Sequence, residues 1–188
     1  MTMRDRPLRA DARRNRDRLV AAAADVVAEQ GSGASLEEVA RRAGVGSATL
    51  HRHFADRRDL LAAVFAGHVD ELCAAGDDLL RGPRAGEALV DWLRAVLRHA
   101  CRHRGLAAAA LAAAGGQGVG AAAHVRIRAA GERLLARAQA AGEVRADLRI
   151  GELLQLVNAI SLAAEREPQA ALLADRLLSI AVEGVRPG

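Results

Sequence analysis

Apolar residues recur along most of the chain at intervals of three and four positions, which is the spacing that lines one face of an α-helix. The pattern begins near Ala12 and places Leu19, Ala23 and Val27 on one side of the first predicted helix. Breaks that contain glycine and proline, such as residues 82–83, separate the later stretches. No segment shows the strict alternation of apolar and polar residues that is typical of a half-buried strand. The pattern therefore predicts an all-α fold of about nine helices.

Four predicted helices precede the break at residues 82–83, and five follow it. The first two end at glycines, the third is short, and the fourth is a long helix that starts at Arg57. The five later helices are predicted over residues 87–104, 106–114, 121–141, 150–165 and 168–185.

A segment near the N-terminus has the pattern of two short helices joined by a tight turn. Ser35 followed by Glu38 is a capping box, which marks the start of a helix. Gly44 supplies a residue that accepts positive φ, as a tight turn after that helix requires. In the next helix Leu50 and Phe54 stand four residues apart and are expected to face inward. The arrangement predicts a helix-turn-helix, a motif that places its second helix in the major groove of DNA.

The second of these helices has an outer face of small or hydrogen-bonding side chains, which suits a groove about 12 Å wide. Arg52 is suited to donate to guanine or phosphate, while Thr49 offers a methyl group to thymine and a hydroxyl group to phosphate. His51 is a candidate donor to phosphate. We therefore predict DNA contacts from the outward-facing positions of this helix, which are Ser47, Ala48, Thr49, His51, Arg52 and His53.

The net charge is only +4, but the charges are unevenly placed, and all 27 basic residues are arginine. Seven arginines and three aspartates precede Leu19. Beside a helix-turn-helix such a segment is typical of phosphate contact, and the alternative is a solvated tail or helix face. We predict that at least one arginine among Arg13, Arg14, Arg16 and Arg18 contacts phosphate, and we take Arg14 as the candidate.

Residues 11–65 resemble the DNA-binding domain of TetR-type repressors in residue type, order and spacing. The matching segments are LVAAA at 19–23 with Gly31, LEEVARRAGV at 36–45, TLHRHF at 49–54 and DRRDLL at 56–61. The family usually has tyrosine at the position of His51, often serine at Gly46, and lysine at Arg57. The resemblance implies a phosphate contact from Arg57. Because Gly46 has no side chain to cap the next helix, we expect Ser47 to serve as its cap.

The resemblance also implies a division of the chain into a flexible basic arm at 1–10, a helix-turn-helix domain at 11–56 and a helical domain at 57–188. The last of these is expected to enclose a ligand cavity and to form a dimer. Candidate cavity residues are apolar or polar side chains on its predicted helices: Trp92, Val96, His99, Leu111, His124, Ile127 and Leu134. For the apolar members, simple core packing is the alternative.

Two apolar stripes near the C-terminus are candidates for the dimer contact. Paired DNA-reading domains need a twofold axis, which favours pairing of these helices with their copies. The alternative is that both stripes belong to the core of a single chain. The candidate residues are Leu153, Val157 and Ile160 in the first stripe and Leu173, Leu177 and Ile180 in the second.

Several classes of protein are disfavoured by what the sequence lacks. No run of 18 apolar residues is present, and the N-terminal residues have no apolar segment of a secretory signal. The two cysteines, Cys73 and Cys101, are expected to be reduced thiols, so we expect a cytoplasmic protein. His99 and His103 have the spacing of some metal ligands, but the arginines around them repel a cation. With no catalytic trio and no phosphate-binding loop, we predict neither an enzyme, a cofactor nor a metal site.

Together these observations predict a homodimeric transcriptional regulator, and we favour a repressor. It would bind double-stranded DNA and release it when a small-molecule effector occupies the helical domain. Two alternatives stay open: a ligand- or partner-binding relative without DNA affinity, and a metal-dependent hydrolase that uses His99 and His103.

Overall fold

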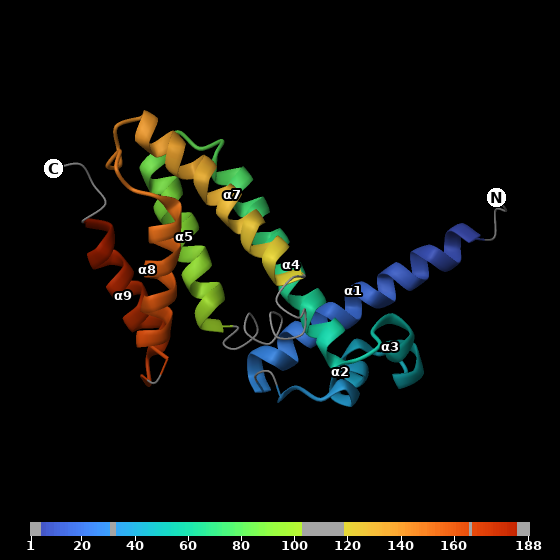
Figure 1. Cartoon of the computed structure of the whole chain (residues 1–188). Coiled ribbons are helices and arrows are strands. Elements are labelled where there is room, and N and C mark those ends of the chain that lie inside the picture. Colours follow the sequence, from blue (N-terminus) through green and yellow to red (C-terminus); the bar gives the residue numbers. More distant parts are fainter. Residues whose placement is uncertain (1–4, 31–32, 103–118, 166, 184–188) are drawn as a thin grey trace. The chain divides into compact units, whose positions relative to one another are not determined.

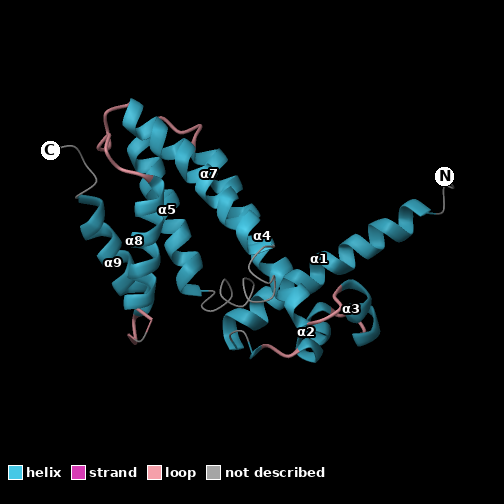
Figure 2. Ribbon diagram, viewed as in Figure 1, coloured by secondary structure: helices cyan, strands magenta, loops and turns pink. Residues whose placement is uncertain are grey.

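A computed structural model describes residues 5–30, 33–102, 119–165 and 167–183. Within these ranges the chain forms eight α-helices and no strand (Figures 1 and 2), which confirms the predicted all-α class. The predicted helix over residues 106–114 lies outside the described residues. The helices are α1 (Asp5–Gln30), α2 (Leu36–Ala43), α3 (Ser47–His53), α4 (Arg57–Leu79), α5 (Ala85–Arg102), α7 (Val119–Ala140), α8 (Ile150–Ala163) and α9 (Ala170–Glu183).

The first helix is longer than the sequence pattern predicts. It begins at Asp5 rather than near Ala12, so residues 5–10 of the predicted flexible arm are helical. Residues 5–10 carry no apolar periodicity, but Leu8, Ala10 and two arginines among them are good helix formers. Pro7 is compatible with this start, since proline is tolerated in the first turn.

The described residues form two compact units, which divide within α4. The first unit extends to Gly67, and the second contains residues 68–102 and the described residues from 122 onward. In the first unit α1 packs against α2, and both contact α3. The largest fully buried side chains of its core are Leu19, Val26, Val39, Leu50, Leu60 and Val64.

The core of the second unit is built around Trp92, whose side chain has no exposed surface. Its helix, α5, packs against α8 and α9. A Cβ atom at Gly131 of α7 would lie only 2.7 Å from the indole ring and from Ile150, so only glycine allows this close approach. The indole Nε1 donates a hydrogen bond to the carbonyl oxygen of Leu72 at 3.0 Å, which holds α4 on α5.

Two ion pairs with the same seven-residue spacing connect α4 to α7. Arg126 lies 2.5 Å from Asp70, and Arg133 lies 2.7 Å from Asp77. Farther along α7, Arg137 donates to backbone carbonyl oxygens near the end of α4. The second half of α4 is therefore held by apolar packing, by the indole of Trp92 and by three arginines of α7.

Candidate DNA interface

The turn between α2 and α3 has the geometry that the glycine predicts. Gly44 has φ 62° and ψ 35°, which is the left-handed conformation. The backbone N–H of Gly44 donates to the carbonyl of Arg41 at 3.2 Å, and that of Val45 donates to Ala40 at 3.0 Å. This pair of bonds satisfies the last carbonyls of α2 and redirects the chain into α3.

The start of α2 is capped as the sequence predicts. The hydroxyl oxygen of Ser35 accepts a hydrogen bond from the backbone N–H of Glu38. The carboxylate of Glu38, however, accepts hydrogen bonds from Arg41 and Arg42 at distances of 2.6–2.8 Å. These bonds lower the pKa of Glu38 to about 2. Arg42 also binds both carboxylate oxygens of Glu29, so a charged network links α2 to α1.

The start of α3 differs from the expectation. Gly46 is the N-cap residue, with φ −65° and ψ 146° and no side-chain hydrogen bond, and Ser47 is the first residue of the helix. The expected capping role of Ser47 is therefore wrong. Its side chain is exposed, which leaves the hydroxyl group available at the first turn of α3.

The outer face of α3 presents the side chains that the sequence places there. Leu50 and Phe54 are buried, while Ala48, His51 and Arg52 are exposed. Thr49 is half-buried, and its hydroxyl oxygen accepts a hydrogen bond from Arg52 Nη2 at 2.9 Å. This bond orients the guanidinium group along the exposed face of α3.

His53 and Arg57 lie at the edge of this face and are half-buried. The ring of His53 is tilted against that of Phe54, with centroids 6.5 Å apart. Arg57 extends toward Gly33, and its Nε and Nη2 atoms are buried without a hydrogen-bond partner among the described residues.

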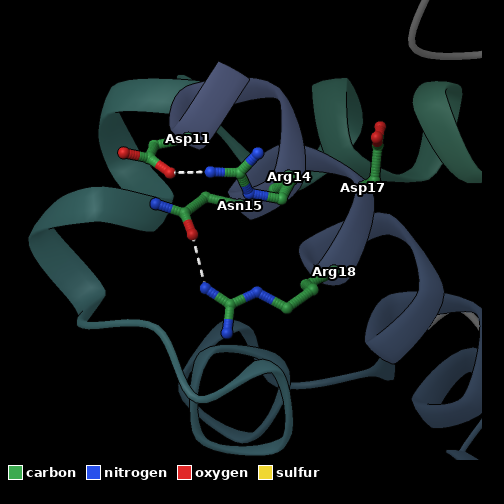
Figure 3. Close-up of a pocket in the computed structure, with 5 residues that line it drawn as sticks. All are labelled: Asp11, Arg14, Asn15, Asp17 and Arg18. Carbon is green, nitrogen blue, oxygen red and sulfur yellow. Dashed lines mark hydrogen bonds and ion pairs between the residues drawn. The ribbon is translucent and has the colours of Figure 1, made fainter. Parts of the chain in front are cut away.

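The arginines at the start of α1 differ from one another in their contacts. Arg14 forms an ion pair with Asp11, and Arg18 donates to the side-chain oxygen of Asn15 (Figure 3). Arg16 lies over the ring of Phe54, 5.3 Å from its centroid. Of the four candidates, Arg14 thus has its charge compensated by an aspartate.

The predicted cavity residues occupy several environments in the second unit. Trp92 and Leu134 are buried in the core, whereas Val96 and Ile127 are half-buried at its margin. His124 is exposed. Leu111 lies outside the described residues. The structure therefore places most of the apolar candidates in or against one packed cluster.

His99 has a neighbour that the sequence analysis missed. Its ring meets the ring of His68 edge-on, with centroids 4.9 Å apart. His68 is buried, and burial lowers its pKa, an effect that nearby Glu71 partly opposes. The missed signal was its position on α4: His68 stands four residues from both Val64 and Leu72, on an otherwise apolar stripe.

Two features typical of other classes of protein are a cluster of metal ligands and a helix that can span a membrane. Within the described ranges, no group of three or more histidine, cysteine or acidic side chains is arranged to hold a metal ion. His103 lies outside these ranges. None of the described helices combines the length and the apolar character that crossing a membrane would require.

The candidate dimer residues are divided between core and surface. Leu153, Val157 and Ile160 are buried in the core of the chain itself, because this stripe of α8 packs onto α5. Leu173 and Leu177 of α9 are half-buried against the same core. Other large apolar side chains of these two helices are exposed: Leu156 and Leu162 on α8, and Leu172 and Ile180 on α9.

Two family models match the chain and together cover most of it. Residues 19–64 match the model described as bacterial regulatory proteins of the tetR family. Residues 84–187 match the C-terminal domain described as transcriptional regulator SbtR-like. The first match contains the helix-turn-helix, and the second contains the core around Trp92.

Solved structures of two relatives agree with this assignment. A TetR transcriptional regulator from Streptomyces coelicolor, SCO0520, is 36% identical with a TM-score of 0.77, and the match covers 92% of this chain and 98% of that one. A TetR regulatory protein from Mycobacterium vanbaalenii is 34% identical with a TM-score of 0.71, covering 96% and 100%.

A curated relative matches over a shorter region. The HTH-type transcriptional activator FasR of Mycolicibacterium smegmatis is 37% identical over 67 residues, which are 35% of this chain. The match spans 31% of that protein, about a third of its length. Regulators of this kind bind DNA and small-molecule effectors, and they typically dimerise. The chain therefore belongs to the TetR family and is a DNA-binding transcriptional regulator rather than an enzyme.

Proposed function

We propose that the protein is a homodimeric repressor that binds an operator through α3 and releases it when a small-molecule effector binds. The observation that carries this proposal is the outer face of α3. Its apolar side chains are buried, while Ser47, Ala48, His51 and Arg52 face solvent beyond the turn at Gly44. A short helix with small and hydrogen-bonding groups on its exposed face suits the major groove.

The proposed roles of the side chains follow from their chemistry. Arg52, oriented by Thr49, donates to a guanine edge or a phosphate, and Thr49 contributes its methyl group at the groove. Ser47 and Ala48 allow the start of α3 to approach the bases closely. His51 and His53 lie farther along the helix, where the backbone of one strand passes. Arg57 binds a phosphate from the edge of this face, where its side chain is half-buried.

Two copies are needed to read two half-sites, and we propose that α8 and α9 form the contact. The exposed fractions of Leu162, Leu172 and Ile180 are 60%, 66% and 61%, so these large apolar side chains are open to a partner. Ile180 is also predicted from the sequence as a dimer contact. We propose Leu162 and Leu172 as contacts in place of the stripe of α8 that is buried in the core of the chain itself. Substitution of Leu172 by Glu is expected to shift the protein toward monomer in sedimentation experiments.

The proposed switch acts through α4, because this helix begins at the edge of the DNA-binding face and continues into the second unit. The indole of Trp92 and the arginines of α7 hold its second half. An effector that rearranges these contacts would displace α4. The distance between the two copies of the helix-turn-helix would then change. A coupling free energy of about 1–3 kcal/mol is sufficient for a 5–150-fold change in operator affinity.

The direction of regulation is tested separately, since the relative from Mycolicibacterium smegmatis is an activator. A reporter gene placed behind the selected operator should be expressed less when the protein is present. Increased expression would overturn the repressor proposal and leave DNA binding intact.

The decisive experiment for DNA binding is selection of duplexes from a random pool by the purified protein. We expect two inverted half-sites whose centres are about 10–10.5 base pairs apart, or a multiple of that distance. Recovery of no preferred sequence, together with no retention of any duplex, would favour a relative that has lost DNA affinity.

Arg57→Ala tests the phosphate contact on the selected operator, with Arg58→Ala as the matched control because Arg58 is exposed and adjacent. We expect Arg57→Ala to weaken binding to all sequences alike and to lower the slope of log affinity against log salt by about 1. A change in base preference instead would show that Arg57 contacts a base. Arg58→Ala is expected to have the smaller effect.

A further inference from the structure

Two histidine rings connect α4 to α5 at the residue where α4 enters the second unit. The two units divide between Gly67 and His68, so His68 is the first residue of the second unit. It is only 9% exposed, and its ring meets the ring of His99 edge-on, with centroids 4.9 Å apart. These two residues are called here the histidine pair.

The residues of α4 on either side of His68 are also held in place. A Cβ atom at Gly67 would lie 3.9 Å from the side chain of Val20 in α1, which is ordinary van der Waals contact. Four residues beyond His68, the carbonyl oxygen of Leu72 accepts the hydrogen bond from the indole of Trp92 at 3.0 Å. The histidine pair therefore lies one helical turn from this hydrogen bond, and both hold the same stretch of α4 on α5.

The surroundings of His68 favour its neutral form. Burial lowers the pKa of His68 below its ordinary value of 6.5; Glu71 of α4 partly opposes this effect, and Arg102 of α5 adds to it. Asp70, two residues along α4, is exposed and forms an ion pair with Arg126 of α7 at 2.5 Å. Among the described residues, Glu71 is thus the acidic group that acts on His68, and its side chain is exposed.

The sign of the pH dependence follows from these neighbours. Because the pKa of the packed His68 ring is lowered, the packed contact is most stable above pH 6.5 and is weakened as the pH falls through the lowered pKa. Protonation places a positive charge on a buried ring beside the cation Arg102. A charged ring gains free energy when it reaches water, so acid favours separation of the histidine pair.

We propose that the histidine pair is a proton-sensitive contact between α4 and α5, which separates in mild acid and thereby lowers affinity for the operator. The inference rests on the proposed operator binding and on the role proposed there for α4. This helix is continuous from Arg57 to Leu79, so a change in its contact with α5 is transmitted to the end that follows the helix-turn-helix. Histidine ordinarily changes its charge between pH 5 and 8, where most carboxylates stay ionised.

The first test needs no DNA and uses Trp92, the only tryptophan of the chain, as a reporter. Its indole binds Leu72 one turn from His68, so separation of the pair should change its surroundings and its emission. We expect the emission of the wild-type protein to shift reversibly between about pH 8 and about pH 5, and that of His68→Phe to stay constant. His124→Phe is the matched control, because it removes an exposed histidine from α7, and it should behave as wild type.

The second test measures operator affinity of the same three proteins at about pH 7.5 and about pH 5.5 at constant salt. His51 and His53 of α3 are present in all three, so any gain in affinity from their protonation beside phosphate is common to them. We expect acid to lower the affinity of wild type about fivefold or more relative to that of His68→Phe, which is the size typical of allosteric coupling. His124→Phe should lose as much as wild type.

A variant of the other ring keeps the proposal testable if His68→Phe does not fold. His99 is half-buried, and His99→Ala removes the ring contact without a charge. We expect its Trp92 emission at about pH 8 to resemble that of wild type at about pH 5, and its operator affinity to be low at both pH values. Emission of His99→Ala that equals that of wild type at both pH values would contradict the proposed contact.

The remaining outcomes separate this proposal from the proposed function. Wild-type emission that does not change with pH, or a change that persists in folded His68→Phe, would overturn the proton-sensitive contact while operator binding stands. An emission change without a change in relative operator affinity would overturn its role in regulation. A wild-type protein that retains no duplex at any pH would overturn the proposed function and with it that role, whereas an emission change lost in His68→Phe would still support the proton-sensitive contact.

Discussion

The helix-turn-helix and the helical body around Trp92 are both all-helical, yet different interactions determine their geometry. In the former, single residues set backbone directions: Ser35 starts α2, and the left-handed conformation of Gly44 ends it. In the latter, shape and volume dominate, because the indole of Trp92 is enclosed where α7 has only Gly131. Local backbone conformation therefore determines the geometry of the helix-turn-helix, whereas mutual packing of side chains determines that of the helical body around Trp92.

The largest loss of stability is expected in the body, from Trp92→Ala. Removal of a fully buried indole leaves a cavity and abolishes the hydrogen bond to Leu72, at a cost of about 3–5 kcal/mol. Trp92→Ala removes the only tryptophan of the chain and with it the tryptophan fluorescence. Unfolding should therefore be followed by circular dichroism during denaturant titration. Trp92→Phe keeps a ring and should lose less. A cost below about 1 kcal/mol for alanine would show that packing around the indole is not decisive.

A smaller change in stability is expected at the turn between α2 and α3, where substitutions of two glycines should have opposite effects. Gly44→Ala places a Cβ atom at φ 62° and should cost about 1–2 kcal/mol, although no atom lies within 4 Å of that Cβ. Gly46→Ser, at φ −65°, adds a capping oxygen and should stabilise α3 by about 0.5 kcal/mol or less.

Hydrogen exchange of the backbone amides of α2 and α3 measures both changes, and the fluorescence of Trp92 serves as a reference for the second unit. Equal protection in Gly44→Ala and wild-type protein would contradict the role assigned to the left-handed turn. Loss of Trp92 fluorescence in either variant would show that the two units do not respond separately.

The same contrast explains which features were predictable from the sequence. The helix-turn-helix was predictable because a capping serine, a turn glycine and the spacing of Leu50 and Phe54 each act within a few residues. The division of α8 into a buried stripe and exposed leucines was not, since both faces carry apolar residues. Which face of α8 is buried depends on how the helix packs against α5. That contact joins residues far apart in sequence, so the local periodicity does not predict it.

Polar features were missed for a related reason. His68 is buried because its helix is covered on that side, and the partner ring of His99 comes from a different helix. The start of α1 was placed too late because apolar periodicity marks only the part of a helix that packs against a core. Residues 11–18 are helical although only Asn15 among them is even half-buried, so their pattern contains charge but no apolar stripe.

The smallest effect is expected from acid, through the charged network between α1 and α2. Hydrogen bonds from Arg41 and Arg42 lower the pKa of Glu38 from 4.5 to about 2, and Arg42 lowers that of Glu29 as well. Because the pKa of Glu38 is lower in the folded state, its ionised form contributes stability above pH 4.5, and this contribution is lost as the pH falls toward 2. The effect should be modest, since the pairs are partly exposed to solvent. Glu38→Gln should reduce the change in α2 amide protection between pH 5 and about 2.5, and an identical pH profile in both proteins would show that the network does not couple α2 to α1.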